Sequence, residues 1–303
     1  MKTFGPADFF GVLLFLALWG GSTAYLGATG ADWTFPLISL AIFGVGLSAI
    51  GWLTTRGAQT EAIKVQNPAK ESGALLLYLA LYAVLFLGFG MGALREQIPE
   101  GRVQELAVMG AKLLAHVVLP AILLVIIGGR LAPLLKSQVS PKHFRRTLIV
   151  IGAIILALLS VVSPSLRQIG ETNAPISLLA WAAPLSFVWI AIEAGLNEEF
   201  LYRAVLQTRL SAFFKSAWTG IAVTSVIFGL AHAPGLFLRG GPDVDGWSTD
   251  PVQVIAYTIA TLAPLSLFFG FLYARTKSLL LVVLLHGTVD VLPNMADFIR
   301  TWG

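Results

Sequence analysis

The chain has 303 residues, of which 56% are hydrophobic and only 12% are charged, and it carries a net charge of +4. Soluble globular domains carry about 25% charged residues, so this composition excludes a soluble protein and argues against secreted, disordered and nucleic-acid-binding chains. The absence of cysteine excludes disulfide frameworks, cysteine zinc sites and thiol nucleophiles. A small positive charge on a mostly apolar chain is typical of basic loops on a membrane protein. We therefore expect an integral membrane protein that contacts the lipid bilayer and no nucleic acid, and no oligomeric state is predicted.

A transmembrane helix needs about 20 apolar residues to cross a hydrocarbon core about 30 Å thick. Apolar runs of roughly this length predict eight or nine transmembrane helices, because the last run is short and the sixth continues into a polar stretch. The runs are continuous and do not alternate with a period of two, which favours helices over a closed barrel. The sequence therefore predicts an all-α, polytopic membrane helical bundle. The runs cover residues 9–26, 35–53, 74–94, 112–127, 147–162, 176–196, 217–231, 252–273 and 279–292.

The distribution of basic residues predicts the orientation of the bundle. With a cytoplasmic N-terminus and nine crossings, 14 of the 20 Lys and Arg residues, Lys2 included, fall on the cytoplasmic side. This bias follows the positive-inside rule, so we expect the N-terminus in the cytoplasm. The apolar run from Phe9 is interpreted as the first transmembrane helix, because no signal cleavage site introduces a polar mature domain and further spans follow.

A first polar cluster lies at the end of the sixth run. An ionisable residue within a span costs about 2.5–3.5 kcal/mol on insertion, so such residues are functional candidates. Glu199 and Arg203 are four residues apart, share a helix face and can form an ion pair. Glu198 is rotated by about 100° from Glu199, needs another partner and suits a general base. The alternative is that the helix ends at Leu196 and that the acids lie in water with Arg209.

Two further clusters each contain a histidine. His232 follows an apolar run, and we expect Pro234 to end the helix just beyond it, where a lone histidine is commonly a capping or interfacial group. His286 and Asp290 are four residues apart, so they share one helix face and lie about 6 Å apart along the axis. Such a pair can bind a metal, hold a water or merely satisfy its own hydrogen bonds.

A single site formed by all three clusters requires tilted or broken helices. At about 1.5 Å per residue from the expected inner ends, His232 lies about 24 Å deep and His286 about 12 Å deep. Pro184 and Gly195 are expected to break the sixth helix and to bring Glu198 inside the bundle.

Taken in order, the three clusters resemble the signature motifs of the CPBP intramembrane proteases, the CAAX-processing and bacteriocin-processing family that is also called ABI. The resemblance covers residues 176–293, and residues 270–279 are similar to a Gly…Arg-Thr-x-Ser-Leu run of that family. Ala204 stands where a glycine usually follows the motif arginine. The third family motif ends in Asn or Asp. The matching motifs are Glu198-Glu199-x-x-x-Arg203, Phe228-x-x-x-His232 and His286-x-x-x-Asp290.

The resemblance implies a prenyl-protein-endopeptidase-like enzyme that hydrolyses a peptide bond of a membrane-associated protein or peptide. It divides the chain into N-terminal transmembrane helices, residues 1–175, with a scaffold role of unknown purpose, and a catalytic core, residues 176–303. It also implies the bacterial cytoplasmic membrane as the location.

The resemblance further implies roles for the motif residues. Glu198 activates a water with His232 as its partner. His286 and Asp290 hold that water, a metal or the developing oxyanion. The three supporting residues form an ion pair beside the site and an aromatic contact to it; they are Glu199, Arg203 and Phe228.

The chemistry of the side chains leaves the question of a metal open. Peptide hydrolysis needs an activated water and a stabilised oxyanion. Glu198, His232, His286 and Asp290 have the side-chain types of a metal-free Glu/His site. They equally suit a catalytic Zn²⁺ site in which His232, His286 and Asp290 are the ligands. An aspartate at 290 favours a metal more than an asparagine would.

Two other functions remain as alternatives. The first is a catalytically silent membrane protein of the same fold, acting in bacteriocin immunity or as a scaffold; the retention of every motif position argues for the enzyme instead. The second is a proton-coupled transporter with Glu193, Glu198 and Glu199 as a relay. No inverted repeat is visible in the sequence and the polar residues lie in one half of the chain, which argues against transport.

Overall fold

The structure, a computed structural model, describes residues 4–303, and all the regular secondary structure in these residues is helical. Within this range 9 helices are long and apolar enough to cross a membrane, which confirms the predicted polytopic helical bundle. Lys2, one of the charges used to predict the orientation, lies outside the described residues. The nine helices are Pro6–Ala28, Thr34–Thr54, Pro68–Gln97, Arg102–Ile126, Pro141–Val162, Ile176–Phe213, Ala217–Arg239, Pro251–Thr276 and Leu279–Trp302.

Several of these helices combine α-helical segments with π-helical segments, which are labelled η. The elements are α1 (Pro6–Ala28), α2 (Thr34–Ser39), η1 (Leu40–Leu47), α3 (Ser48–Thr54), α4 (Pro68–Tyr82), η2 (Ala83–Gly90), α5 (Met91–Gln97), α6 (Arg102–Leu113), η3 (Leu114–Val118), α7 (Leu119–Ile126), α8 (Ala132–Leu135), α9 (Pro141–Val162), α10 (Ser165–Glu171), α11 (Ile176–Ile190), η4 (Ala191–Leu196), η5 (Glu199–Gln207), α12 (Thr208–Phe213), α13 (Ala217–Arg239), α14 (Pro251–Thr276) and α15 (Leu279–Trp302).

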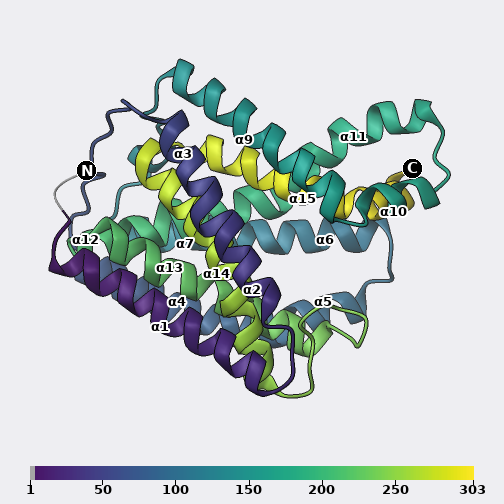
Figure 1. Ribbon diagram of the computed structural model, residues 1–303, viewed down its shortest axis with the longest axis horizontal. Helices are drawn as coiled ribbons and strands as arrows, with labels where there is room; N and C mark the ends of the chain where they lie inside the picture. Colours follow the sequence, from purple (N-terminus) through teal and green to yellow (C-terminus); the bar gives the residue numbers. More distant parts are fainter. Residues whose placement is uncertain (1–3) are drawn as a thin grey trace.

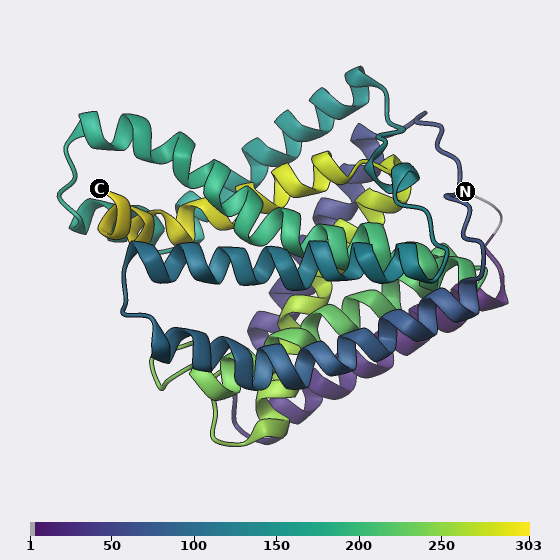
Figure 2. The same ribbon diagram turned by 180° about the vertical axis from the view of Figure 1, so that it is seen from behind.

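The helices α14 and α15 form the centre of the bundle. In each, 67% of the most apolar stretch is buried, against 22% in α1. α1, η1 and α13 pack against α14, while α9 and α11 pack against α15. In Figure 1, α1, α4 and α13 run together in the lower half, α9, α11 and α15 lie in the upper half, and α14 crosses between the two groups. From behind, the helix of residues 102–126 runs across the face between them (Figure 2). N-terminal helices therefore pack directly on the C-terminal ones, and the division at residue 175 stays a prediction.

The outer surface of the bundle is strongly apolar. Leu85, Ile126 and Val161 expose 64%, 75% and 84% of their surfaces, respectively. Large apolar patches are uncommon on soluble proteins, whereas lipid tails solvate such side chains well. The low charge of the sequence is thus explained by helices whose outer faces contact the hydrocarbon core.

Two expectations about helix ends and breaks are wrong. Pro234 does not end its helix, because α13 continues to Arg239 with the proline in its interior. Neither Pro184 nor Gly195 breaks the sixth helix, which remains helical through η4 and η5. A proline removes one backbone donor, which membrane helices tolerate when neighbours supply the packing. A π-turn inserts a residue without interrupting the helix, so it redirects side chains in place of a break.

Glycines allow the central helices to approach closely. A Cβ on Gly229 of α13 would lie 2.8 Å from the carbonyl oxygen of Thr258 in α14. A Cβ on Gly195 would lie 2.7 Å from the carbonyl oxygen of Val283 in α15. Small residues at helix interfaces are the usual means by which membrane helices pack tightly. These two contacts fix α13 and the sixth helix beside the central pair.

We therefore predict that Gly229→Ala destabilises the fold by about 1–3 kcal/mol, because the added methyl group meets a main-chain oxygen that cannot rotate away. The measurement is the free energy of unfolding of purified protein in mixed detergent micelles. Gly110→Ala is the matched control, since a Cβ at Gly110 of α6 meets no atom within 4 Å. Equal stability of the two variants would contradict the proposed close contact.

Candidate active site

Glu198 and Glu199 lie inside the bundle, where η4 gives way to η5. The side chain of Glu199 is 0% exposed and that of Glu198 is 19% exposed. The alternative in which both acids lie in water beside Arg209 is not observed. Arg209 instead forms a buried ion pair with Glu71 of α4, with Nε 3.2 Å from Oε2. The helix that carries the two acids therefore passes through the interior and does not end at the membrane surface.

His286 connects the two adjacent glutamates. Its Nδ1 atom lies 2.8 Å from Oε1 of Glu199, and its Nε2 atom lies 3.6 Å from Oε2 of Glu198. The same Nε2 atom lies 3.1 Å from Oδ2 of Asp290, one turn further along α15. Both ring nitrogens thus face carboxylate oxygens, and only the imidazolium form can donate from both nitrogens at once. His286 is 4% exposed, so these contacts are made away from solvent.

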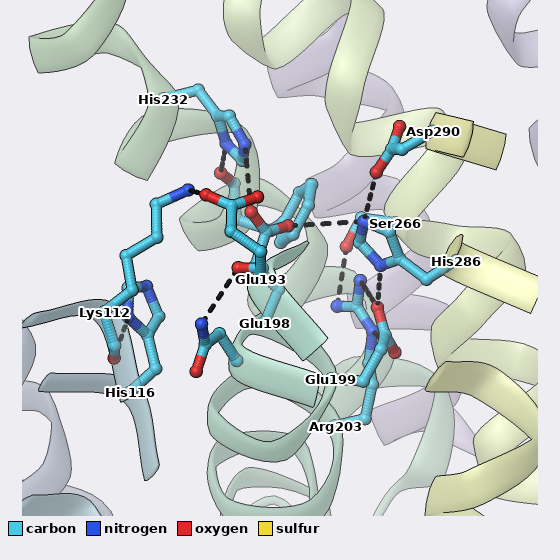
Figure 3. Close-up of polar contacts among 12 residues, drawn as sticks. Lys112, His116, Glu193, Glu198, Glu199, Arg203, His232, Ser266, His286 and Asp290 are labelled. Carbon is cyan, nitrogen blue, oxygen red and sulfur yellow. Dashed lines mark hydrogen bonds and ion pairs between the residues drawn. The ribbon is translucent and has the colours of Figure 1, made fainter. Parts of the chain in front are cut away.

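His232 approaches Glu198 from the other side (Figure 3). Its Nε2 atom lies 3.9 Å from Oε1 of Glu198. Its Nδ1 atom lies 2.8 Å from the carbonyl oxygen of Phe228, one turn earlier in α13. A carbonyl oxygen can only accept, so Nδ1 donates and Nε2 of the neutral ring keeps a free lone pair directed towards Glu198.

The three motif clusters therefore meet around one carboxylate. Glu198 lies between α13 and α15, so these helices converge on the site without packing tightly against each other. His232 and His286 thus both reach Glu198, although the sequence places them at different expected depths.

A buried ion pair between Arg203 and Glu199 supports this arrangement. Arg203 is 0% exposed, and its Nε atom lies 3.1 Å from Oε2 of Glu199. Its Nη1 atom donates to Oγ of Ser266 in α14 at 2.9 Å. The guanidinium carbon lies 4.9 Å from the ring centroid of Phe228 and 6.0 Å from that of Phe269. One arginine thus links the sixth helix to α13 and α14 through charge, hydrogen bonding and cation–π contact.

The opposite wall of the site comes from the N-terminal half of the chain. Oη of Tyr82 lies 2.8 Å from Nε2 of His116, and both side chains are buried. Lys112, one turn before His116, forms an ion pair with Glu193. In Figure 3, Lys112 and His116 lie across from His286.

A cavity of about 570 Å³ opens between the two walls, and Glu198 and His232 line it together with Tyr82, Lys112 and His116. Cavities that bind drug-sized molecules fall in this size range. The helices that were expected to be a scaffold of unknown role therefore form part of the cavity that Glu198 and His232 line.

The donor atoms do not form a ready-made metal site. Among residues 4–303, no group of three or more His, Asp or Glu side chains is arranged to hold a metal ion. Nε2 of His286, a candidate ligand, is already within hydrogen-bonding distance of Asp290, the second candidate. Nδ1 of the same ring faces Glu199. No step below is derived through a metal, and zinc stays a prediction for experiment.

Sequence reasoning found the motif residues, including the supporting Glu199, Arg203 and Phe228, but missed the residues from other helices that contact them or line the cavity. Ser266 carried a weak signal, since it is a hydroxyl in the middle of an apolar run. Phe269, whose ring stacks on His286 with centroids 4.9 Å apart, carried none, because aromatic residues are ordinary in a membrane helix. Lys112 and Tyr82 lie more than 80 residues before the motifs, and nothing in their local sequence links them to Glu198.

Comparison with known proteins agrees with this geometry. Residues 179–292 match the family model described as Rce1-like, type II CAAX prenyl endopeptidase Rce1-like. No curated protein and no solved structure matches the chain. The matched segment begins in α11, ends in α15 and contains all three motifs. The resemblance seen in the sequence is thereby confirmed over residues 179–292, which are similar to the Rce1-like type II CAAX prenyl endopeptidases.

Proposed function

We propose that this protein is an intramembrane endopeptidase that hydrolyses a peptide bond of a membrane-associated protein or peptide. The observation that carries the proposal is the convergence of His232, His286 and, through His286, Asp290 on Glu198 from three separate helices, with Glu198 and His232 lining one cavity. The family match supports a CAAX-type protease in general terms. The substrate's lipid tether would lie in the same bilayer that solvates the outer helices.

Glu198 is the proposed general base, and His232 is its partner. Both the carboxylate of Glu198 and Nε2 of His232 can accept a hydrogen bond, so together they orient a water by its two hydrogens. That orientation directs an oxygen lone pair of the water away from both acceptors and towards a substrate carbonyl. The water oxygen attacks the carbonyl carbon while Glu198 takes the proton.

His286 is the proposed electrostatic stabiliser. As an imidazolium held by Glu199 and Asp290, it places a positive charge 3.6 Å from Glu198, beside the position where the oxyanion forms. Asp290, as an ionised carboxylate, accepts a hydrogen bond from Nε2 of His286 and so fixes the orientation of the imidazole ring. When the carbon–nitrogen bond breaks, the proton held by Glu198 passes to the leaving amine, so the products are an acid and an amine.

Of the two forms that the sequence left open, we propose the metal-free one. Both nitrogens of His286 already face carboxylates, and a zinc ion bound to Nε2 would have to replace the hydrogen bond between this atom and Asp290. The cytoplasmic N-terminus and the bacterial cytoplasmic membrane remain our proposed orientation and location.

The first prediction concerns the base. Glu198→Gln is expected to reduce kcat by about 10²–10⁴-fold, because the amide cannot accept a proton from water. The measurement is cleavage of a lipid-tethered fluorogenic peptide by purified protein in liposomes, with one substrate tethered through an S-farnesyl cysteine and one through an N-terminal acyl chain. Glu171→Gln, at an exposed ion pair with Arg167, is the control and should leave the rate unchanged. Equal rates for wild type and Glu198→Gln would reject this role, and no cleavage by the wild type would favour the silent-scaffold alternative.

The second prediction concerns the buried ion pair. Arg203→Ala is expected to cost about 3–5 kcal/mol of stability, because it leaves the carboxylate of Glu199 buried without its main partner. Arg203→Lys keeps the charge but loses the forked donor geometry, so an intermediate loss is expected. Thermal unfolding in detergent measures both. The exposed ion pair that Arg167 forms is the comparison, because Arg167→Ala should change the free energy of unfolding by less than about 1 kcal/mol. A neutral Arg203→Ala would contradict the supporting role of the pair.

The third prediction concerns the metal. Protein that has been treated with a chelator, and shown by elemental analysis to contain no zinc, should keep its peptidase activity. The reason is that the proposed proton transfers use only side chains of this chain. Loss of activity that added Zn²⁺ restores would overturn the metal-free form and favour the alternative in which His232, His286 and Asp290 are ligands.

A further inference from the structure

The cavity that contains Glu198 also has a cation at its rim. Arg239 is the last residue of α13, and it lines the same cavity as Glu198 and His232. It follows His232 by seven residues, which is close to two helical turns, so both side chains project from nearly the same face of α13. A single helix therefore presents a proposed catalytic histidine and an arginine to one cavity.

The other cations of the cavity have acidic or amide partners within the protein. Lys112 forms an ion pair with Glu193. Arg95 lies 3.8 Å from Glu105 and donates to the side chain of Gln104 at 3.3 Å.

Arg239 differs from both. Among residues 4–303 it forms no ion pair, and it donates one hydrogen bond, from Nη1 to the carbonyl oxygen of Leu87 at 2.8 Å. Asp245 also lines the cavity but makes no ion pair with Arg239. A guanidinium has five donors, so most of those on Arg239 remain available to a bound molecule. A planar, forked set of donors suits a carboxylate.

The position of Arg239 sets the distance between the cleaved bond and such a carboxylate. Its Nη2 atom lies 3.3 Å from the position that a Cβ on Gly235 would occupy, so the guanidinium is folded back along α13 towards His232. Gly235 lies about 4.5 Å beyond His232 along the helix axis, and the Cα of Arg239 lies about 10.5 Å beyond it. An extended peptide covers about 3.3–3.6 Å per residue, so this range corresponds to about one to three residues.

We propose that Arg239 is a specificity-determining residue that binds a substrate carboxylate one to three residues from the cleaved bond. The carboxylate belongs either to the free C-terminus of the substrate or to an acidic side chain near the cleavage position. In both cases Arg239 selects the substrate by charge, while Glu198 and His232 act on the peptide bond. The proposal rests on the peptidase function proposed above.

The experiment compares four fluorogenic peptides that share an S-farnesyl cysteine tether. The first ends three residues after the cysteine as a free acid, and the second is its C-terminal amide. The third is an amide with aspartate as its last residue, and the fourth is a free acid extended by four residues. Wild type, Arg239→Gln, Arg239→Lys and the control Arg167→Gln are assayed in liposomes, and KM and kcat are measured separately.

For the free acid, Arg239→Gln should raise KM by about 10- to 100-fold and change kcat little, because one charged hydrogen-bonded contact is lost on binding. Arg239→Lys should restore part of the affinity, and Arg167→Gln should match wild type. Amidation and extension should each raise the KM of wild type but not that of Arg239→Gln. Good cleavage of the aspartate amide by wild type would assign the carboxylate to a side chain, and poor cleavage would assign it to the C-terminus.

Two results would overturn the proposal. One is an unchanged KM for the free acid in Arg239→Gln that retains the wild-type unfolding temperature. The other is equal discrimination between acid and amide by wild type and Arg239→Gln. If wild type cleaves none of the peptides, the proposed peptidase function fails, but the charge selection is still measurable. Fluorescence anisotropy of the same peptides on Glu198→Ala, with and without Arg239→Gln, then tests Arg239 by binding alone.

Discussion

The carboxylate of Glu199 is the group on which the rest of the site depends. It is fully buried, and it accepts from Arg203 on its own helix and from His286 on α15. A buried carboxylate of this kind is very costly unless its partners are in place, so the membrane interior selects the one packing that satisfies it. That packing sets the ring plane of His286, and through it the position of Asp290.

The same carboxylate explains why two glutamates stand side by side. Adjacent residues in a helix point about 100° apart, so Glu199 can face the interior while Glu198 faces the cavity. Glu199 is fully buried and serves a structural role, whereas the side chain of Glu198 stays 19% exposed. One π-helical segment ends two residues before the pair and a second begins at Glu199, and the helix continues through both.

The N-terminal helices have a definite place in this arrangement. They do not contribute a motif, but α4, α6 and η3 supply the wall opposite His286 and line the cavity with Tyr82, Lys112 and His116, respectively. α4 also contributes Glu71, whose buried pairing with Arg209 anchors the end of the sixth helix. The cavity is thus shared between the two halves of the chain.

The sequence by itself determined the class of the fold, the approximate spans and the chemistry-bearing residues. Long apolar runs can only be membrane helices, and the charges that interrupt them are too costly to be incidental, which is why Glu198, His232, His286 and Asp290 stood out. Helix ends and breaks were less predictable. The effect of Pro234 and Gly195 on their helices depends on the neighbouring helices that pack against them, and neither residue broke its helix.

Only the tertiary structure decided which side chains meet. The contacts of Arg203 with Ser266 and Phe269, the wall formed by Lys112 and His116, and the cation at Arg239 all join positions that are remote in sequence or unmarked by any motif. Local patterns report the helix on which a residue lies and the face that it occupies. Partners on other helices are set by crossing angles and close glycine contacts, which depend on the packing of the whole bundle.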